Sequence, residues 1–173
     1  GSPNGQWHFS STYKGGAFPQ TIKDEVNDWV DRILADMKAH KDDFPYWVQK
    51  GWMSQNTADF YIKYGGFKVK KSYAYAAVQA EVKALTPLQY GDLSDILEGA
   101  TRGKIRCGIG HGGGSHWTTR TYNGIDWGLG TEAFAEMTSA TMTSPESLAT
   151  IKKYLPKSYA MYEGMLKVIA NQP

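Results

Sequence analysis

Two histidines and two glutamates lie close together between residues 108 and 136. His111 and His116 are in a glycine-rich segment, and Glu132 and Glu136 follow, four residues apart, in a predicted helix. Imidazole and carboxylate groups are preferred zinc ligands in proteins, and they also act as general acids and bases. The combination predicts either a metal site or a site of acid–base chemistry.

The segment that carries the histidines is unusually rich in glycine. Six of the fifteen residues from 103 to 117 are glycines, which allow positive φ angles and a close approach of the backbone to a ligand. The glycine spacing is not that of a phosphate-binding loop, because no hydrophobic strand precedes it and no Gly-Lys-Ser/Thr follows. A plain surface loop is the alternative interpretation, and it leaves the roles of both histidines open.

The two glutamates are expected near the start of a helix capped by Thr131. Residues four apart are separated by about one helical turn, so Glu132 and Glu136 share one flank. A carboxylate in a first turn also offsets the helix dipole, which is a sufficient explanation for Glu132 but a weaker one for Glu136.

The rest of the chain predicts a single, mostly α-helical domain over residues 21–173, with little or no β-structure, after an irregular arm at 3–20. Apolar residues recur at helical spacing from 22 to 41, with Thr21 as the expected N-cap. Residues 42–53 are interpreted as an aromatic-rich turn. Further helices are expected at about 55–64, within 67–85, after Pro87, after Thr131, from Ser144 to about 154, and from Lys157 to Asn171.

Composition limits the functional classes only loosely. The length of 173 residues suits one domain, and the net charge of +2 neither favours nor excludes a nucleic-acid partner. The single cysteine, Cys107, excludes an intrachain disulfide. With no apolar run long enough to span a bilayer and no signal-type N-terminus, we expect a cytoplasmic or virion-associated protein.

Three segments occur together in a recognisable order: DLSDILEGATRGKI, GIGHGGGSHW and TEAFAEMTSATMTSPESLATIKKYLPKSYAMYEGML. Together they resemble the C-terminal end of the anthrax lethal factor-like zinc metallopeptidases. The similarity is closer to the related domains of phage minor head proteins and of phage-linked or polymorphic bacterial toxins. It covers about residues 88–170 and implies a zincin-like fold, a zinc cofactor, and a peptide, protein substrate or phage head protein as partner.

The resemblance also implies residue roles. Glu132 matches the zinc-binding glutamate, and Glu136 matches the acidic residue one turn later that supports the site. In an active peptidase of this kind, Tyr122 would stabilise the oxyanion of the transition state. His111 and His116 would line the substrate cleft or complete the zinc ligands.

The chain departs from the family in one respect, because no HExxH motif occurs in its 173 residues. The nearest imitation runs from Asp36 to His40 and has a methionine where the water-activating glutamate is needed. We therefore expect no peptidase activity from this chain. Either an HExxH helix lies upstream in the natural protein, or the domain is a non-catalytic binding module, or His111 and His116 ligate zinc with Glu132.

A different class of function needs no metal. Cations, two acid–base candidates and stacking rings occur in one segment, which would suit a metal-independent ribonuclease toxin that uses His111 and His116. The residues are Arg102, Lys104, Arg106, His111, His116, Trp117, Arg120 and Tyr122. A second basic group, Lys68, Lys70 and Lys71, is interpreted as a solvated face. Nucleic acid is favoured less than a protein partner.

Overall fold

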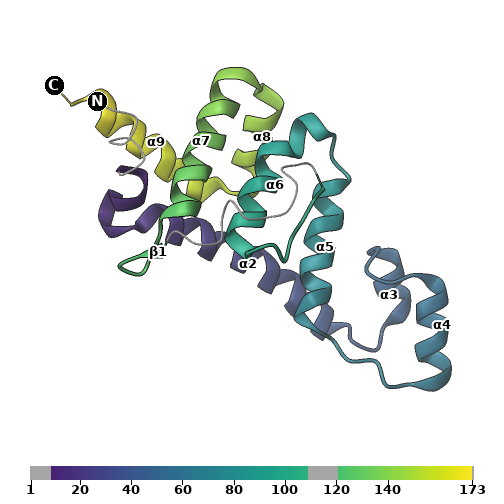
Figure 1. Cartoon of the computed structure of the whole chain (residues 1–173). Coiled ribbons are helices and arrows are strands. Elements are labelled where there is room, and N and C mark those ends of the chain that lie inside the picture. Colours follow the sequence, from purple (N-terminus) through teal and green to yellow (C-terminus); the bar gives the residue numbers. More distant parts are fainter. Residues whose placement is uncertain (1–8, 109–120, 173) are drawn as a thin grey trace.

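The computed structural model describes residues 9–108 and 121–172 (Figure 1). Helices account for most of these ranges, and the strands in them form one two-stranded hairpin. In chain order the elements are η1 (Tyr13–Gly15), α2 (Ala17–Ala39), α3 (Phe44–Gln49), α4 (Gln55–Tyr64), α5 (Lys71–Lys83), α6 (Pro87–Thr101), β1 (Thr121–Tyr122), β2 (Ile125–Asp126), α7 (Trp127–Thr143), α8 (Pro145–Tyr154) and α9 (Pro156–Ala170). The predicted mostly helical fold with little β-structure is confirmed.

Helix α2 is the element around which the others pack. It contacts α5, α6, α7 and α9, and Figure 1 shows it running beneath the group formed by α6, α7 and α8. Its side chains Ile22, Val26 and Val30, spaced by four residues, are fully buried. Burial of each such side chain contributes about 1.5–3 kcal/mol. No helix in the described ranges combines the length and apolar character that a membrane span requires.

The N-terminal end of α2 differs from the prediction. The helix begins at Ala17 and not after Thr21, and residues 9–12 are already helical, so the described part of the predicted arm is not irregular. Pro19 fits because the first turn of a helix needs no N–H donor there. Gly16 precedes the helix at φ 90°, and a Cβ at this position would lie 2.7 Å from the side chain of Ile125.

Helix α3 forms within the segment that was expected to be only a turn. Pro45 lies in its first turn, where proline is tolerated, and the Asp43 side chain caps it. Trp47 is buried, and its ring lies 4.9 Å from that of Phe67. Trp47 belongs to the hydrophobic core, and Trp52 and Phe67 pack against it, with α3 and α4 at one end of the molecule (Figure 1).

Helix α7 begins five residues earlier than predicted, because its N-cap is Asp126 and not Thr131. Asn123 and Gly124 have φ angles of 51° and 77° and form the turn between β1 and β2. The next residue but one, Asp126, caps α7 by accepting a hydrogen bond from the Leu129 N–H at 3.0 Å. Thr131 is therefore not the N-cap, and Glu132 lies beyond the first turn. Since the dipole effect falls off within that turn, it does not account for Glu132.

Candidate functional site

Three carboxyl side chains meet where α6 packs against α7. Asp92 and Asp95 lie one turn apart on α6, and both are hydrogen-bonded to Glu136 of α7. Asp92 also accepts a hydrogen bond from the Ser147 hydroxyl of α8 at 2.5 Å. All three carboxyl side chains are partly buried. We call Asp92, Asp95 and Glu136 the α6–α7 carboxyl cluster.

The cluster changes the protonation of Glu136. Burial raises the pKa of this carboxyl to about 10, helped by its hydrogen bond to Asp92 and the negative charge of Asp95. A carboxyl group with such a pKa keeps its proton at neutral pH. Glu136 is therefore a hydrogen-bond donor to the aspartates of α6, and the proton is what allows three acidic groups to pack together.

Glu132 precedes Glu136 by one turn on α7, about 6 Å along the helix axis. Both side chains are partly buried, whereas Ala135 between them is exposed. The two glutamates thus lie on one flank of a helix whose start is fixed by the Asp126 cap. A ligand bound at this flank would meet side chains held by regular helix and not by a loop.

The other residues singled out from the sequence lie partly outside the described ranges. His111 and His116 fall in 109–120, and of Tyr122 only the backbone is described, paired with Ile125 in the hairpin. Within 9–108 and 121–172, no three His, Cys, Asp or Glu side chains are arranged to hold a metal ion.

The HExxH imitation at the end of α2 has a structural explanation. His40 is the C-cap of α2, and its Nδ1 lies 3.0 Å from the carbonyl oxygen of Asp36 and 3.1 Å from the Asp36 carboxylate. Its ring stacks on Tyr46 at 3.8 Å. These contacts fix the histidine at the helix end, where its Nδ1 lies beside one of the last carbonyl oxygens.

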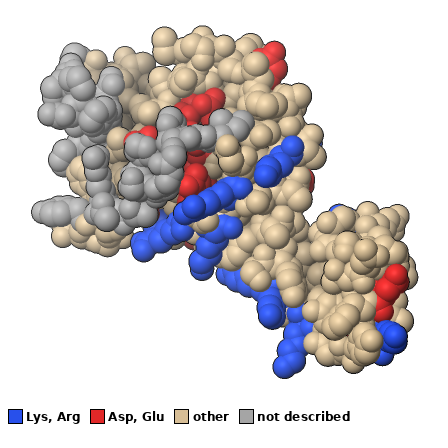
Figure 2. Space-filling view, turned by 45° about the vertical axis from the view of Figure 1, so that its right-hand side comes forward, with Lys and Arg blue, Asp and Glu red and all other residues tan. Residues whose placement is uncertain are grey.

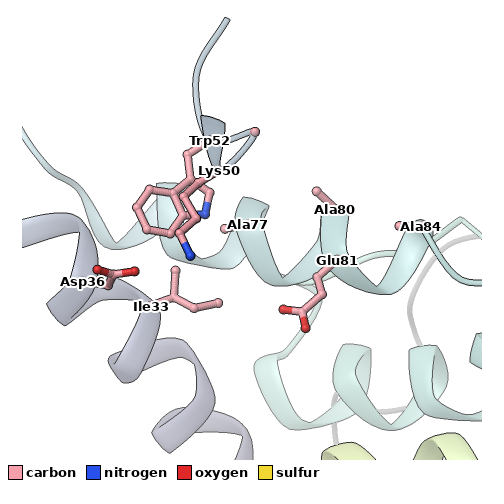
Figure 3. A pocket seen from close by; sticks show the side chains of 9 residues that line it. Ile33, Asp36, Lys50, Trp52, Ala77, Ala80, Glu81 and Ala84 are labelled. Atoms are coloured by element: carbon pink, nitrogen blue, oxygen red, sulfur yellow. The ribbon is translucent and has the colours of Figure 1, made fainter. Parts of the chain in front are cut away.

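A pocket of about 520 Å³ opens between α2, α5 and the turn after α3. Figure 3 shows Lys50 and Trp52 reaching from that turn toward Ile33 and Asp36 of α2, with Glu81 on α5. The remaining lining residues are Gly51, Ala77, Ala80 and Ala84. Asp36 accepts a hydrogen bond from the Tyr46 hydroxyl at 2.9 Å, so its carboxylate holds α2 to α3. None of the predicted site residues lines this pocket.

Cys107 is not a candidate nucleophile. Its side chain is buried, and burial raises the pKa of the thiol to about 11, against the opposing effect of the Lys83 charge. We expect iodoacetamide at pH 8 to label the folded chain at least about 100-fold more slowly than the urea-unfolded chain, because only the thiolate reacts. Mass spectrometry of timed samples measures both rates. Labelling of the folded chain within about tenfold of the unfolded rate contradicts this burial.

The sequence pattern did not indicate a role for the two aspartates of the cluster. Asp92 and Asp95 are three residues apart, beside the apolar stripe of α6. Acidic residues with this spacing are common on the exposed face of a helix, so the spacing alone indicates no function. Their relation to Glu136 depends on how α6 packs against α7, which no local pattern specifies.

No family model, curated protein or solved structure matches the chain. The chemistry of the site is therefore inferred from its own residues and their arrangement.

Proposed function

We propose that this chain is a zinc metallopeptidase-like domain of the kind found in phage minor head proteins and phage-linked toxins, with its metal site at the flank of α7. The observation that supports this proposal is the α6–α7 carboxyl cluster beside Glu132. Packing carboxyl groups together costs free energy, which is offset by a proton or a bound cation. Carboxyl groups whose pKa is strongly shifted by such packing are concentrated at catalytic and ligand-binding sites.

Each residue of this site would have a separate role. Glu132 would ligate the metal. Glu136 would support the site through its hydrogen bonds to Asp92 and Asp95 of α6. The hydroxyl of Ser147 orients Asp92 in turn. His111 and His116 would supply the imidazole ligands or line the substrate cleft, and Tyr122 would donate to the substrate carbonyl. Bound zinc would supply Lewis acidity and lower the pKa of a water molecule.

Peptide hydrolysis also needs a carboxylate that takes the proton of the attacking water, and no HExxH motif provides one in this sequence. We therefore expect this chain to bind zinc without cleaving peptides. A retained metal site without hydrolysis also suits the alternative role, a binding or structural module of a phage head protein.

Zinc content tests the proposal. We expect protein saturated with zinc and then desalted to retain about one zinc per chain, measured by plasma mass spectrometry. Glu132→Ala is expected to retain below about 0.1, whereas Glu163→Ala, an exposed glutamate on α9, retains the wild-type amount. Wild-type protein with below about 0.1 zinc per chain would overturn the proposal.

A further inference from the structure

The segment that follows α6 runs alongside α5 (Figure 1). The ammonium group of Lys104 lies 5.5 Å from the centre of the Tyr75 ring on α5. Two residues later, the backbone N–H of Arg106 donates a hydrogen bond to the side-chain oxygen of Gln79 at 2.8 Å. The contacts thus advance along the segment and along α5 in the same direction.

Cations from both elements form one row. Lys71 lies 5.7 Å from the Tyr75 ring, on which Lys104 also packs. Lys83 is the last residue of α5, and its charge acts on the Cys107 thiol. Twelve residues separate Lys83 from Lys71, which corresponds to about 18 Å along the helix axis. We call Lys71, Lys104 and Lys83 the α5 cation row, and all three side chains are exposed.

Carboxylates do little to neutralise the row. Among the described residues, no ion pair joins a carboxylate to its three lysines. Arg106 is not part of the row, because its side chain turns back to the Glu98 carboxylate at 3.8 Å and to the Gly103 carbonyl at 3.1 Å. The net charge of the chain is only +2, so the row is a local concentration of charge. Figure 2 shows Lys and Arg side chains in a line across the body toward the α3–α4 end, with acidic side chains gathered above them.

We infer that the α5 cation row binds the phosphate backbone of single-stranded nucleic acid. A stripe of exposed cations along one helix matches the backbone of a strand that carries one negative charge per nucleotide. A lipid surface is a poorer match, because the exposed large apolar side chains of the described chain lie on α4, α6, α7 and α9 and none lies on the row. This inference is independent of the zinc proposal.

The expected binding is electrostatic and independent of sequence. Three phosphate contacts predict that log Kd changes with log salt concentration with a slope of about 2, because each contact on a single strand contributes about 0.7. The Kd in low salt is expected near about 10⁻⁵ M, which is typical of non-specific binding.

Fluorescence anisotropy with a fluorescein-labelled oligothymidine tests the inference. The double variant Lys71→Glu/Lys104→Glu is expected to weaken binding at least about tenfold. The matched control is Lys152→Glu/Lys153→Glu on α8, where two exposed lysines also lie beside tyrosine rings, at 5.0 Å and 5.2 Å. The control has the same net charge and is expected to bind within about twofold of wild type.

Circular dichroism confirms that both double variants are folded before binding is measured. The inference is overturned if wild-type protein does not bind the oligonucleotide, or if the two double variants lose affinity equally, since net charge alone would then explain binding. It is also overturned if phosphatidylserine vesicles or polyglutamate, at equal charge concentration, bind more tightly than the oligonucleotide.

Discussion

Replacing Glu136 with glutamine is expected to raise the free energy of unfolding at pH 8 by about 1–3 kcal/mol, which is less than the full pKa shift corresponds to because the side chain is partly exposed. Glutamine keeps the shape of the side chain, and its amide donates to Asp92 as the protonated carboxyl does. The variant loses only the group that ionises in the unfolded chain.

The pH dependence follows from the raised pKa of Glu136. The folded chain holds the proton up to about pH 10, whereas an ordinary glutamate releases it near pH 4.5. Between these values the folded state binds more protons than the unfolded state, so the stability of the wild-type chain falls as pH rises. Glu136→Gln removes this contribution, and its advantage over wild type should grow from pH 5 to pH 9.

Urea unfolding at several pH values measures this difference. Glu163→Gln on α9 is the matched control, because it removes an exposed carboxylate of the same kind. We expect its stability to follow that of the wild type within about 0.5 kcal/mol at each pH. A Glu136→Gln variant that is less stable than wild type at pH 8 would show that Glu136 is ionised in the folded chain.

Replacing Glu25 with alanine is expected to lower the free energy of unfolding by about 3 kcal/mol. The Glu25 carboxylate on α2 is buried and accepts hydrogen bonds from the Lys157 N–H at 2.8 Å and the Ser158 N–H at 2.9 Å. It also accepts from the Ser158 hydroxyl at 2.8 Å. The N-cap of α9, Leu155, has no side chain that caps the helix, so Glu25 caps it from α2.

Removal of the Glu25 carboxylate leaves buried donors at the start of α9 without a partner, which costs more than loss of a surface contact. Thermal unfolding measures the effect, and Asp28→Ala, an exposed acidic residue on the same helix, is the control. Glu25→Gln keeps one acceptor oxygen and is expected to lie between wild type and Glu25→Ala. Equal melting temperatures for Glu25→Ala and Asp28→Ala would refute the cap.

Local sequence patterns predicted the start of α8 but not the starts of α2 and α7. Ser144 followed by Pro145 predicted the start of α8, and its hydroxyl accepts from the Ser147 N–H as expected. The start of α7 was placed at Thr131 although Asn123-Gly124, a strong hairpin signal, was present upstream. A hairpin directly before Asp126 would have identified that residue as the cap.

Contacts between side chains that are far apart in the sequence could not be predicted from local patterns. No local pattern assigns a partner to Glu25, yet its carboxylate accepts hydrogen bonds from residues more than 130 positions away. Asp92 and Asp95 acquire their role only because α7 returns beside α6. In the described chain, acidic groups lie at the α6–α7 contact and cations lie on α5 and the segment after α6. This separation of charge around α6 is not visible in a net charge of +2.

The zinc-edge X-ray absorption spectrum of zinc-loaded protein tests the central claim most directly, because it reports the ligand atoms themselves. We predict nitrogen and oxygen ligands at about 2.0–2.1 Å with imidazole scattering, and loss of this pattern in Glu132→Ala. A sulfur ligand at about 2.3 Å, which would point to Cys107, or an unchanged spectrum in Glu132→Ala would contradict a metal site at the flank of α7.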